Sequence, residues 1–187
     1  MNKNLLIFRT IKKITKILPV RKLQLFNSEI TLICHPKNLK NILSFLKNHV
    51  LCQFKILTCI SGIDYLKKKN RFKIVYELLS IRFNIRCRVV CFVDELVVID
   101  SITSLYSAAG WFECEIWDMF GVFFKNHSNL KRLLTDYGFE GFPLRKDFPL
   151  SGFVEMRYNE VNNRVVSESI ELSQEYRAFR FISPWEN

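Results

Sequence analysis

The residues best suited to chemistry lie in one stretch of the chain, from Trp111 to Pro149. Carboxylates, a histidine, basic side chains and many aromatics are mixed there without low-complexity sequence. The ionisable residues of interest are Glu113, Glu115, Asp118, His127, Lys131, Arg132, Asp136, Arg145, Lys146 and Asp147. Such a mixture is typical either of a chemical site or of a binding surface. Their spacing has to decide between the two.

The spacing disfavours independent catalysis. Glu113 and Glu115 are two positions apart, so on a helix they face different sides, and only Glu115 with Asp118 can share a face. The stretch has no nucleophile with a local base, no glycine-rich phosphate loop and no flavin or nicotinamide fingerprint. We therefore expect the carboxylates to be salt-bridge and capping partners of lysine and arginine. We expect His127 to be a satisfied polar residue and not a ligand.

The cysteines disfavour a metal site. The six cysteines are scattered and none forms a CxxC pair. Zinc and iron–sulfur sites need closely spaced thiolates, and the nearest pair, Cys87 and Cys91, falls in a predicted strand. Most of these thiols lie among apolar residues, where a free cysteine acts as a small hydrophobe. We expect a reducing compartment and no metal or cofactor bound by this chain.

Composition and charge favour an acidic partner. The formal net charge is +10 and the pI is near 9.4, which suits nucleic acid, anionic lipid or acidic protein surfaces. No window approaches the ~20 apolar residues of a membrane-spanning helix, so we expect no direct transmembrane span. The frequent Phe, Lys, Asn and Ile have AT-rich codons, as in many organelle genomes, and this bias accounts for part of the charge.

A basic amphipathic helix is predicted at the N-terminus. Its apolar residues Ile7, Ile11, Ile14 and Leu18 are at helical spacing, and Pro19 ends it. This pattern is typical of a mitochondrial presequence or of a structural arm that lies on a partner or an anionic lipid surface. We expect the structural arm.

The elements before residue 111 predict an α+β fold. Strands are expected at residues 28–34, 52–60, 72–83 and 85–94, with a helix from Pro36 to about His49. The short connection from Phe83 to Ile85 predicts antiparallel pairing of the last two strands. Asp100 or Ser101 is expected to cap a further helix, interrupted by Gly110. This order predicts a mixed, largely antiparallel sheet covered on one face by helices.

The last part of the chain has a different character. A hairpin is predicted around Asn162 and Asn163, followed by a polar and aromatic tail with too few aliphatic residues for its own core. Such sequences are typical of an extended arm on a neighbour's surface. We therefore expect a basic arm at 1–27, an α+β core domain at 28–125, and a loop, hairpin and tail at 126–187 that dock on a partner subunit.

Three functions remain open on this reading: an isolated enzyme, a stand-alone basic nucleic-acid-binding domain of an organelle, and an interaction subunit. The charge and the basic turn at 67–71 favour nucleic acid, but no strand alternates aromatic and basic residues in an RNA-binding pattern. The loop at 135–150 favours an interaction subunit. It combines glycines, prolines and charges with Tyr137, Arg145 and Phe148, and its Tyr and Arg are typical of binding hot spots.

The chain from about Trp111 to Glu186 also resembles a known family. It contains the runs WFECEIWDMFGVFFKNHSNLKRLLTDYGFEGFPLRKDFPLSG, VEMRY, RVVSE and SPWE. These are similar to the NADH dehydrogenase subunit 9 family, the 30-kilodalton or C-type subunits of respiratory complex I. The family signature falls on Glu113, Glu115, Asp118, Met119, Phe120, His127, Lys131, Leu133 and Leu134. Cys114 stands where the family usually has arginine, Phe142 where it has histidine, and Arg180 where an acidic residue is common.

The resemblance implies a non-catalytic structural subunit of the peripheral arm of NADH:ubiquinone oxidoreductase, a proton-translocating enzyme. Its place would be the quinone module, beside the 49-kilodalton subunit and other peripheral-arm subunits, with no nucleic-acid partner. FMN, iron–sulfur clusters and ubiquinone would be held by other subunits. The implied location is the matrix side of the mitochondrial inner membrane, with the chain encoded in an AT-rich mitochondrial genome.

The resemblance also implies which residues lie at the interface. These are Glu113, Glu115, Asp118, His127, Lys131, Arg132, Asp136, Tyr137, Arg145, Lys146, Asp147 and Phe148. Because loop and tail would clamp a neighbour, the charge reversals Arg145→Glu and Asp147→Lys are expected to impair assembly and to leave the isolated fold intact.

Overall fold

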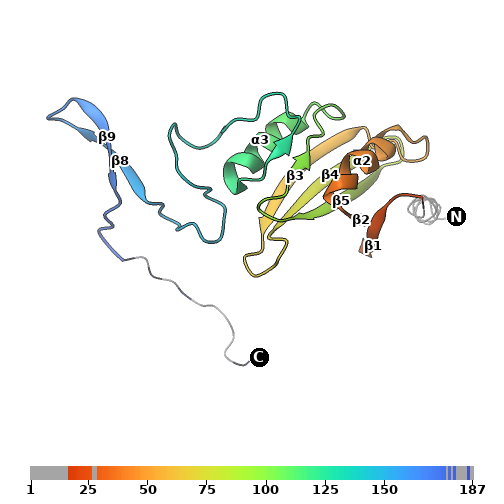
Figure 1. The fold of residues 1–187 in the computed structure, drawn as a ribbon, viewed down its shortest axis with the longest axis horizontal. Coiled ribbons are helices and arrows are strands. Elements are labelled where there is room, and N and C mark those ends of the chain that lie inside the picture. The colour runs from red at the N-terminus through yellow and green to blue at the C-terminus, as the bar shows by residue number, and fades with distance from the viewer. Residues whose placement is uncertain (1–16, 27–28, 176, 178, 180–184, 186–187) are drawn as a thin grey trace. The chain divides into compact units, whose positions relative to one another are not determined.

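The structure, a computed structural model, describes residues 17–26, 29–175, 177, 179 and 185. The chain divides after Phe148 into two compact units, and the first contains the large sheet and both described α-helices (Figure 1). The helix predicted over residues 4–18 lies almost entirely outside the described residues. The division into arm, core domain and docking segment is a functional one and stays a prediction.

The first unit has an α+β architecture. Its elements are β1 (Val20–Phe26), β2 (Glu29–Cys34), the 3-10 turn η1 (Pro36–Asn38), α2 (Leu39–Asn48), β3 (Ile56–Asp64), β4 (Phe72–Ser80), β5 (Ile85–Val93), β6 (Ile99–Asp100), α3 (Ala109–Phe120) and β7 (Phe124–Lys125). Five strands form one sheet in the order β1-β2-β5-β4-β3. Among the described strands of this sheet, β2 and β5 pair in parallel and the other neighbours are antiparallel. β6 and β7 form a separate, parallel pair. The predicted fold class is confirmed.

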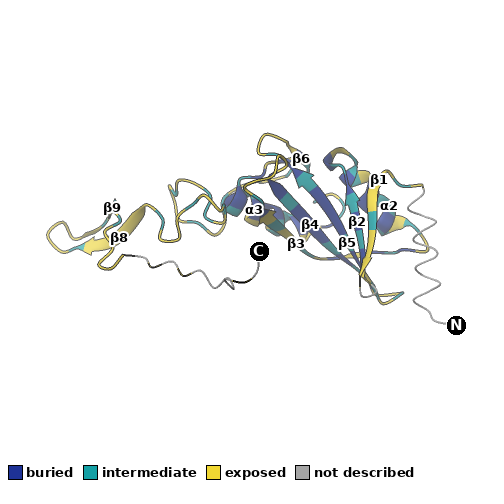
Figure 2. Ribbon diagram, turned by 90° about the horizontal axis from the view of Figure 1, so that it is seen from below, coloured by how far each residue is buried: buried dark blue, intermediate teal, exposed yellow. Residues whose placement is uncertain are grey.

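One face of this sheet forms the core together with both helices. Side chains on a strand alternate between faces, so residues in register make rows across the sheet. One such row is Leu32, Val89, Tyr76 and Ile60. α2 covers it with the predicted apolar stripe of Leu39, Ile42, Leu43 and Leu46, and α3 contributes Ile116 and Phe120 to the same core. Figure 2 shows the central strands in the colour of buried residues.

Three strands differ from the sequence-based prediction. β4 ends at Ser80 and not at Phe83, because residues 81–84 form the turn to β5. β1 is not predicted, because its side chains are mostly polar or exposed and only pairing with β2 defines it as a strand. β3 begins at Ile56, although a strand is predicted from Cys52. The residues before it close the end of α2 instead: Cys52 and Phe54 are buried, and the Phe54 N–H donates to the Leu46 carbonyl at 3.1 Å.

The helix expected from Asp100 or Ser101 does not form there. The chain makes turns until α3 begins at Ala109, so Gly110 lies in the first turn of the helix and does not interrupt it. The Ser101 hydroxyl donates its hydrogen bond to Glu113 and caps no helix. The expected cover of the sheet is nevertheless present, since Ile102 and Tyr106 are buried.

The second unit, from Pro149 onward, contains the predicted hairpin. β8 (Val154–Asn159) and β9 (Arg164–Ser169) pair in antiparallel fashion, and Asn163 has the positive φ of 47° that tight hairpin turns require. Nearly all of its side chains are exposed, as the yellow strands in Figure 2 show. Isolated two-stranded hairpins are only marginally stable in water. The hairpin therefore depends on further contacts for its stability.

Candidate docking surface around α3

The implied interface residues differ in burial. Glu113 and Asp118, both on α3, are fully buried. The exposed members are Glu115, Lys131, Asp136, Tyr137, Lys146 and Asp147, and those of intermediate burial are His127, Arg132, Arg145 and Phe148. Glu115 and Asp118 can share a helical face by spacing, yet they lie in different environments. The structure therefore does not bring them together as a carboxylate pair.

Glu113 connects α3 to the loop that follows β6. The Ser101 hydroxyl donates to its Oε2 at 2.6 Å and the Ile102 N–H donates to its Oε1 at 2.8 Å. Burial raises the pKa of Glu113 above the usual carboxyl range, and these two hydrogen bonds oppose the rise. The hydrogen-bond donors to Glu113 are thus a hydroxyl and a backbone N–H. The sequence-based expectation of a lysine or arginine partner is wrong for this residue. Glu113 thus fixes a turn within the chain.

Asp118 organises the loop after β7. Its Oδ2 accepts hydrogen bonds from the N–H groups of Leu133, Leu134 and Thr135 at 3.0, 2.7 and 2.9 Å, and its Oδ1 accepts one from the Thr135 hydroxyl at 2.6 Å. Burial alone would raise the pKa of Asp118, but these hydrogen bonds outweigh it and hold the pKa below its usual value. Arg132 adds a weaker contact at 3.5 Å. One buried carboxylate therefore shapes three consecutive residues of the signature stretch.

His127 is a satisfied polar residue, in agreement with the sequence-based expectation. Its Nδ1 accepts a hydrogen bond from the Asn129 N–H at 3.1 Å, and its Nε2 lies 3.1 Å from the Gly110 carbonyl in the first turn of α3. This arrangement requires the neutral tautomer with the proton on Nε2. The buried Cys114 thiol donates to the Asn129 carbonyl at 3.5 Å. Both side chains hold the loop against α3.

The loop before Phe148 packs closely on the end of α3. Gly121 ends the helix with φ 76°, and its N–H donates to the Trp117 carbonyl at 2.9 Å. A Cβ at this position would lie 2.6 Å from the Phe142 ring and 2.7 Å from the Arg145 guanidinium. Arg145 donates from Nε to the Phe120 carbonyl at 2.7 Å. Arg145 is therefore held by contacts within the chain.

Large apolar side chains remain exposed around this framework. Trp111 is 67% exposed, Leu134 60% and Tyr137 fully exposed. Further exposed apolar residues in this part of the unit are Leu96, Val97, Val98, Phe123, Leu133 and Leu144. Apolar side chains in such number within one region are typical of a protein–protein interface. Asp118 shapes the loop that carries Leu133 and Leu134, whereas Trp111 lies on α3 itself.

The described residues offer no arrangement of at least three His, Cys, Asp or Glu side chains that could hold a metal ion. The six cysteines, all within the described ranges, are free thiols. Burial raises the pKa of the Cys52 thiol to about 11 and that of the Cys34 thiol to about 12. These two thiols are therefore uncharged near neutral pH and pack as small apolar groups.

Sequence reasoning missed the partners of the signature residues. Asp64, Arg71 and Glu95 form ion pairs that reach Asp147 or Arg145. The sequence shows Arg71 only as the end of a basic turn and Asp64 only as a polar residue after a strand. A signal exists in the sequence, because Asp64 ends β3 and Arg71 directly precedes β4, so an acid and a base flank the same turn.

Comparison with known proteins identifies the family. The model of the respiratory-chain NADH dehydrogenase 30-kilodalton subunit family matches residues 32–154. The "NADH-ubiquinone oxidoreductase subunit 9" of Reclinomonas americana is 58% identical over 158 residues, which cover 84% of this chain and 78% of the relative. The "NADH dehydrogenase [ubiquinone] iron-sulfur protein 3" of Solanum tuberosum is 57% identical over 145 residues, covering 78% of this chain and 76% of the relative.

Solved structures agree with this match. The trypsin-resistant fragment (1-134) of Nqo5 has a TM-score of 0.56 at 25% identity, over 65% of this chain and 97% of that one. A chain of the membrane-bound sulfane sulfur reductase, an archaeal respiratory membrane complex, has a TM-score of 0.67 at 20% identity. The match covers 76% of this chain and 85% of that one. At this low identity the match supports the fold and no shared function. No helix of the described ranges is long and apolar enough to span a membrane. The nucleic-acid-binding alternative finds no support in these comparisons.

Proposed function

Because the chain belongs to the 30-kilodalton subunit family of respiratory-chain NADH dehydrogenase, we propose that it is a non-catalytic structural subunit of the peripheral arm of that complex. Its place is the quinone module, beside the 49-kilodalton subunit and other peripheral-arm subunits. FMN, iron–sulfur clusters and ubiquinone are held by other subunits. The chain lies on the matrix side of the mitochondrial inner membrane and supports assembly around the path of electrons from NADH to ubiquinone.

One observation carries the structural role. Glu113 and Asp118, the buried acids of the signature, accept hydrogen bonds from loops of their own chain. A general acid or base has to reach a substrate proton, and the hydrogen bonds that these two carboxylates accept come mainly from backbone groups and hydroxyls. His127 Nε2 lies 3.9 Å from Glu113 Oε2, but it is closer to the Gly110 carbonyl, at 3.1 Å. Their role is to shape the loops, which expose apolar and charged side chains. The surface so formed suits permanent docking on a protein partner.

The hairpin and the loop are the segments proposed to dock. In β8 and β9 one face carries Val154, Met156, Tyr158 and Val165, and all four are more than half exposed. The opposite face is charged, and Arg157 donates to Glu168 at 2.5 and 2.8 Å across the strands. An amphipathic hairpin of this kind is stabilised when its apolar face is covered. The neighbouring subunits provide that cover in our proposal.

Native electrophoresis tests this function. A tagged copy of the chain is expressed in mitochondria, and detergent extracts are separated without denaturation. The tag is expected to co-migrate with in-gel NADH dehydrogenase activity, and removal of the chain is expected to abolish the active band. Migration of the tagged chain as a free monomer, with the active band intact in its absence, would refute the proposal.

A further inference from the structure

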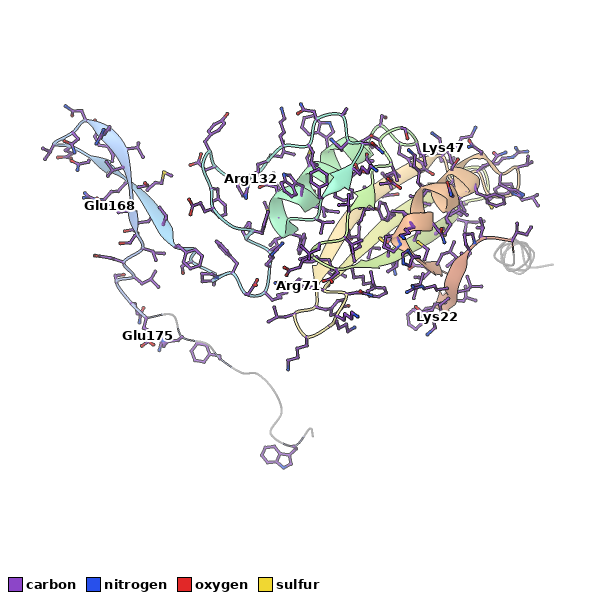
Figure 3. All side chains as sticks on the ribbon, in the orientation of Figure 1. Lys22, Lys47, Arg71, Arg132, Glu168 and Glu175 are labelled. Atoms are coloured by element: carbon purple, nitrogen blue, oxygen red, sulfur yellow. The ribbon has the colours of Figure 1, made fainter. Side chains whose placement is uncertain are left out.

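A cluster of charged side chains around Arg71, which is labelled in Figure 3, ties the loop before Phe148 to one end of the sheet. Arg71 precedes β4 and donates from Nε and Nη2 to the two carboxylate oxygens of Asp64, at 2.8 and 2.9 Å, where β3 ends. Its Nη2 also donates to Asp147 Oδ1 at 2.7 Å, and its Nη1 donates to Glu95. The Lys146 N–H donates to Asp64 Oδ2 at 2.8 Å. Two consecutive loop residues are therefore attached to one ion pair.

A second attachment involves Arg145. Its Nη1 lies 3.7 Å from the same Glu95 carboxylate, and its guanidinium lies 4.5 Å above the centre of the Phe142 ring. The guanidinium also lies 5.2 Å from the centre of the Phe72 ring. The cluster thus holds the loop by charge, by backbone hydrogen bonding and by cation–π contact.

The two sides of the cluster differ in how firmly they are fixed. The Asp64 side chain is fully buried and that of Arg71 is 11% exposed, whereas that of Asp147 is 51% exposed. Asp64 and Arg71 flank the turn between β3 and β4, where the Tyr65 N–H donates to the Arg71 carbonyl at 2.8 Å. The ends of β3 and β4 therefore fix the positions of Asp64 and Arg71, and the loop binds to this preformed pair through Lys146 and Asp147.

The ionic groups remain charged near neutral pH. The hydrogen bonds from Arg71 lower the pKa of Asp64 and of Asp147 below the usual carboxyl value. The same bonds raise the pKa of Arg71 above its already high value. The attachment is therefore intact at physiological pH.

We propose that Asp64 and Arg71, which lie outside the family signature, are positioning residues that hold Lys146 and Asp147 and so fix the surface that the signature loop presents to its partner. This inference rests on the proposed function. From Asn126 to Phe148 the chain has neither helix nor strand, and a loop of this length orders only through specific contacts. A loop already ordered loses less conformational entropy on docking.

The attachment of the loop contributes more to presentation than to the stability of the fold. The Asp147 side chain is half exposed, and ion pairs at exposed sites contribute little to the stability of a fold. Loss of the Asp147 contact is therefore expected to release the loop and to leave the sheet intact. A substitution at Arg71 also removes hydrogen bonds from the buried Asp64 carboxylate. A substitution at Asp147 affects the loop alone and therefore separates loop attachment from the stability of the sheet.

The test compares three variants of the full-length chain. Asp147→Asn weakens the loop side of the cluster, Arg71→Lys keeps the charge but loses the two-pronged contact, and Glu140→Gln is the control, an exposed carboxylate of the same loop. Trypsin cleavage after Arg145 and Lys146 is followed by mass spectrometry. Urea unfolding measures stability, and native electrophoresis measures incorporation into NADH dehydrogenase.

Asp147→Asn and Arg71→Lys are expected to raise the rate of cleavage at these sites about five-fold or more and to lower incorporation by a comparable factor. Asp147→Asn is expected to leave the urea midpoint unchanged, and Glu140→Gln to match the wild type throughout. Unchanged cleavage in Asp147→Asn, or faster cleavage with wild-type incorporation, would overturn the positioning role. If Arg71→Lys unfolds, Asp147→Asn decides the matter alone.

The same experiment separates this inference from the proposed function. If the wild-type chain itself fails to enter the complex, the proposed function fails and the inference falls with it. If the wild-type chain enters the complex, and Asp147→Asn and Arg71→Lys enter it equally well despite faster cleavage, only the inference fails. The cleavage rates of the isolated chain are independent of any partner.

Discussion

At the scale of single residues, the signature carboxylates are structural groups that act on neighbouring backbone. Asp118 offers two oxygens to three N–H groups and a hydroxyl, all contributed by residues 133–135. Charge-assisted hydrogen bonds of this kind are shorter and about twice as strong as neutral ones. The negative charge of Asp118 is therefore part of the loop's conformation.

Asp118→Asn is expected to destabilise the chain by about 2 kcal/mol, because an amide presents one acceptor oxygen and no charge to the same donors. The pKa of Asp118 is lower in the folded than in the unfolded chain. The stability from its charge is therefore complete above the unfolded value of about 3.9 and is lost as the pH falls through the folded pKa. Urea unfolding at neutral and at acidic pH measures this difference, with the exposed Glu115→Gln as control. If the free energy of unfolding differed between wild type and Asp118→Asn by the same amount at neutral and at acidic pH, the role of the Asp118 charge would be contradicted.

At the scale of elements, the end of α3 determines where the following loop lies. Gly121 and Gly138 share a left-handed backbone, with φ 76° and 72°, but a Cβ at Gly121 would meet Phe142 and Arg145 whereas none of the described atoms lies within 4 Å of one at Gly138. The two positions therefore separate backbone strain from close packing.

Gly138→Ala is expected to cost about 1 kcal/mol through strain alone. Gly121→Ala is expected to cost a further 1–3 kcal/mol or so, because the Phe142 ring and the Arg145 guanidinium have to move. Chemical denaturation of both variants measures the difference. Equal losses would show that the loop does not pack on the helix end as described.

The elements also show what the sequence could and could not predict. The apolar stripe of α2 and the β-branched runs of β4 and β5 carry their own periodicity, so their type and pairing are predictable. β1 has no such periodicity, and its partner strand defines it. Apart from Asp64, which flanks the same turn as Arg71, the partners of Asp118 and Arg71 lie 14 to 76 residues away. Contacts over such separations follow from the fold and not from local pattern, so they could not be predicted.

At the scale of the whole molecule, the chain has a compact first unit with its own core and a C-terminal unit whose described residues are nearly all exposed or half-buried. The boundary after Phe148 follows directly on the residues that the cluster around Arg71 holds. Nearly all residues of β8 and β9 are exposed, so the second unit has little to stabilise it by itself. The core that drives folding therefore lies in the first unit, and in our proposal the signature loop and the second unit provide the docking surface.

The central claim is that the chain serves assembly and not electron transfer itself. The most direct measurement replaces the chain in mitochondria by a version that ends at Phe148. It then determines both the amount of assembled NADH dehydrogenase and the rate of NADH:ubiquinone turnover per assembled complex. We predict that the amount falls several-fold and that turnover per assembled complex stays at the wild-type value. A normal amount of complex with a reduced turnover would contradict the account.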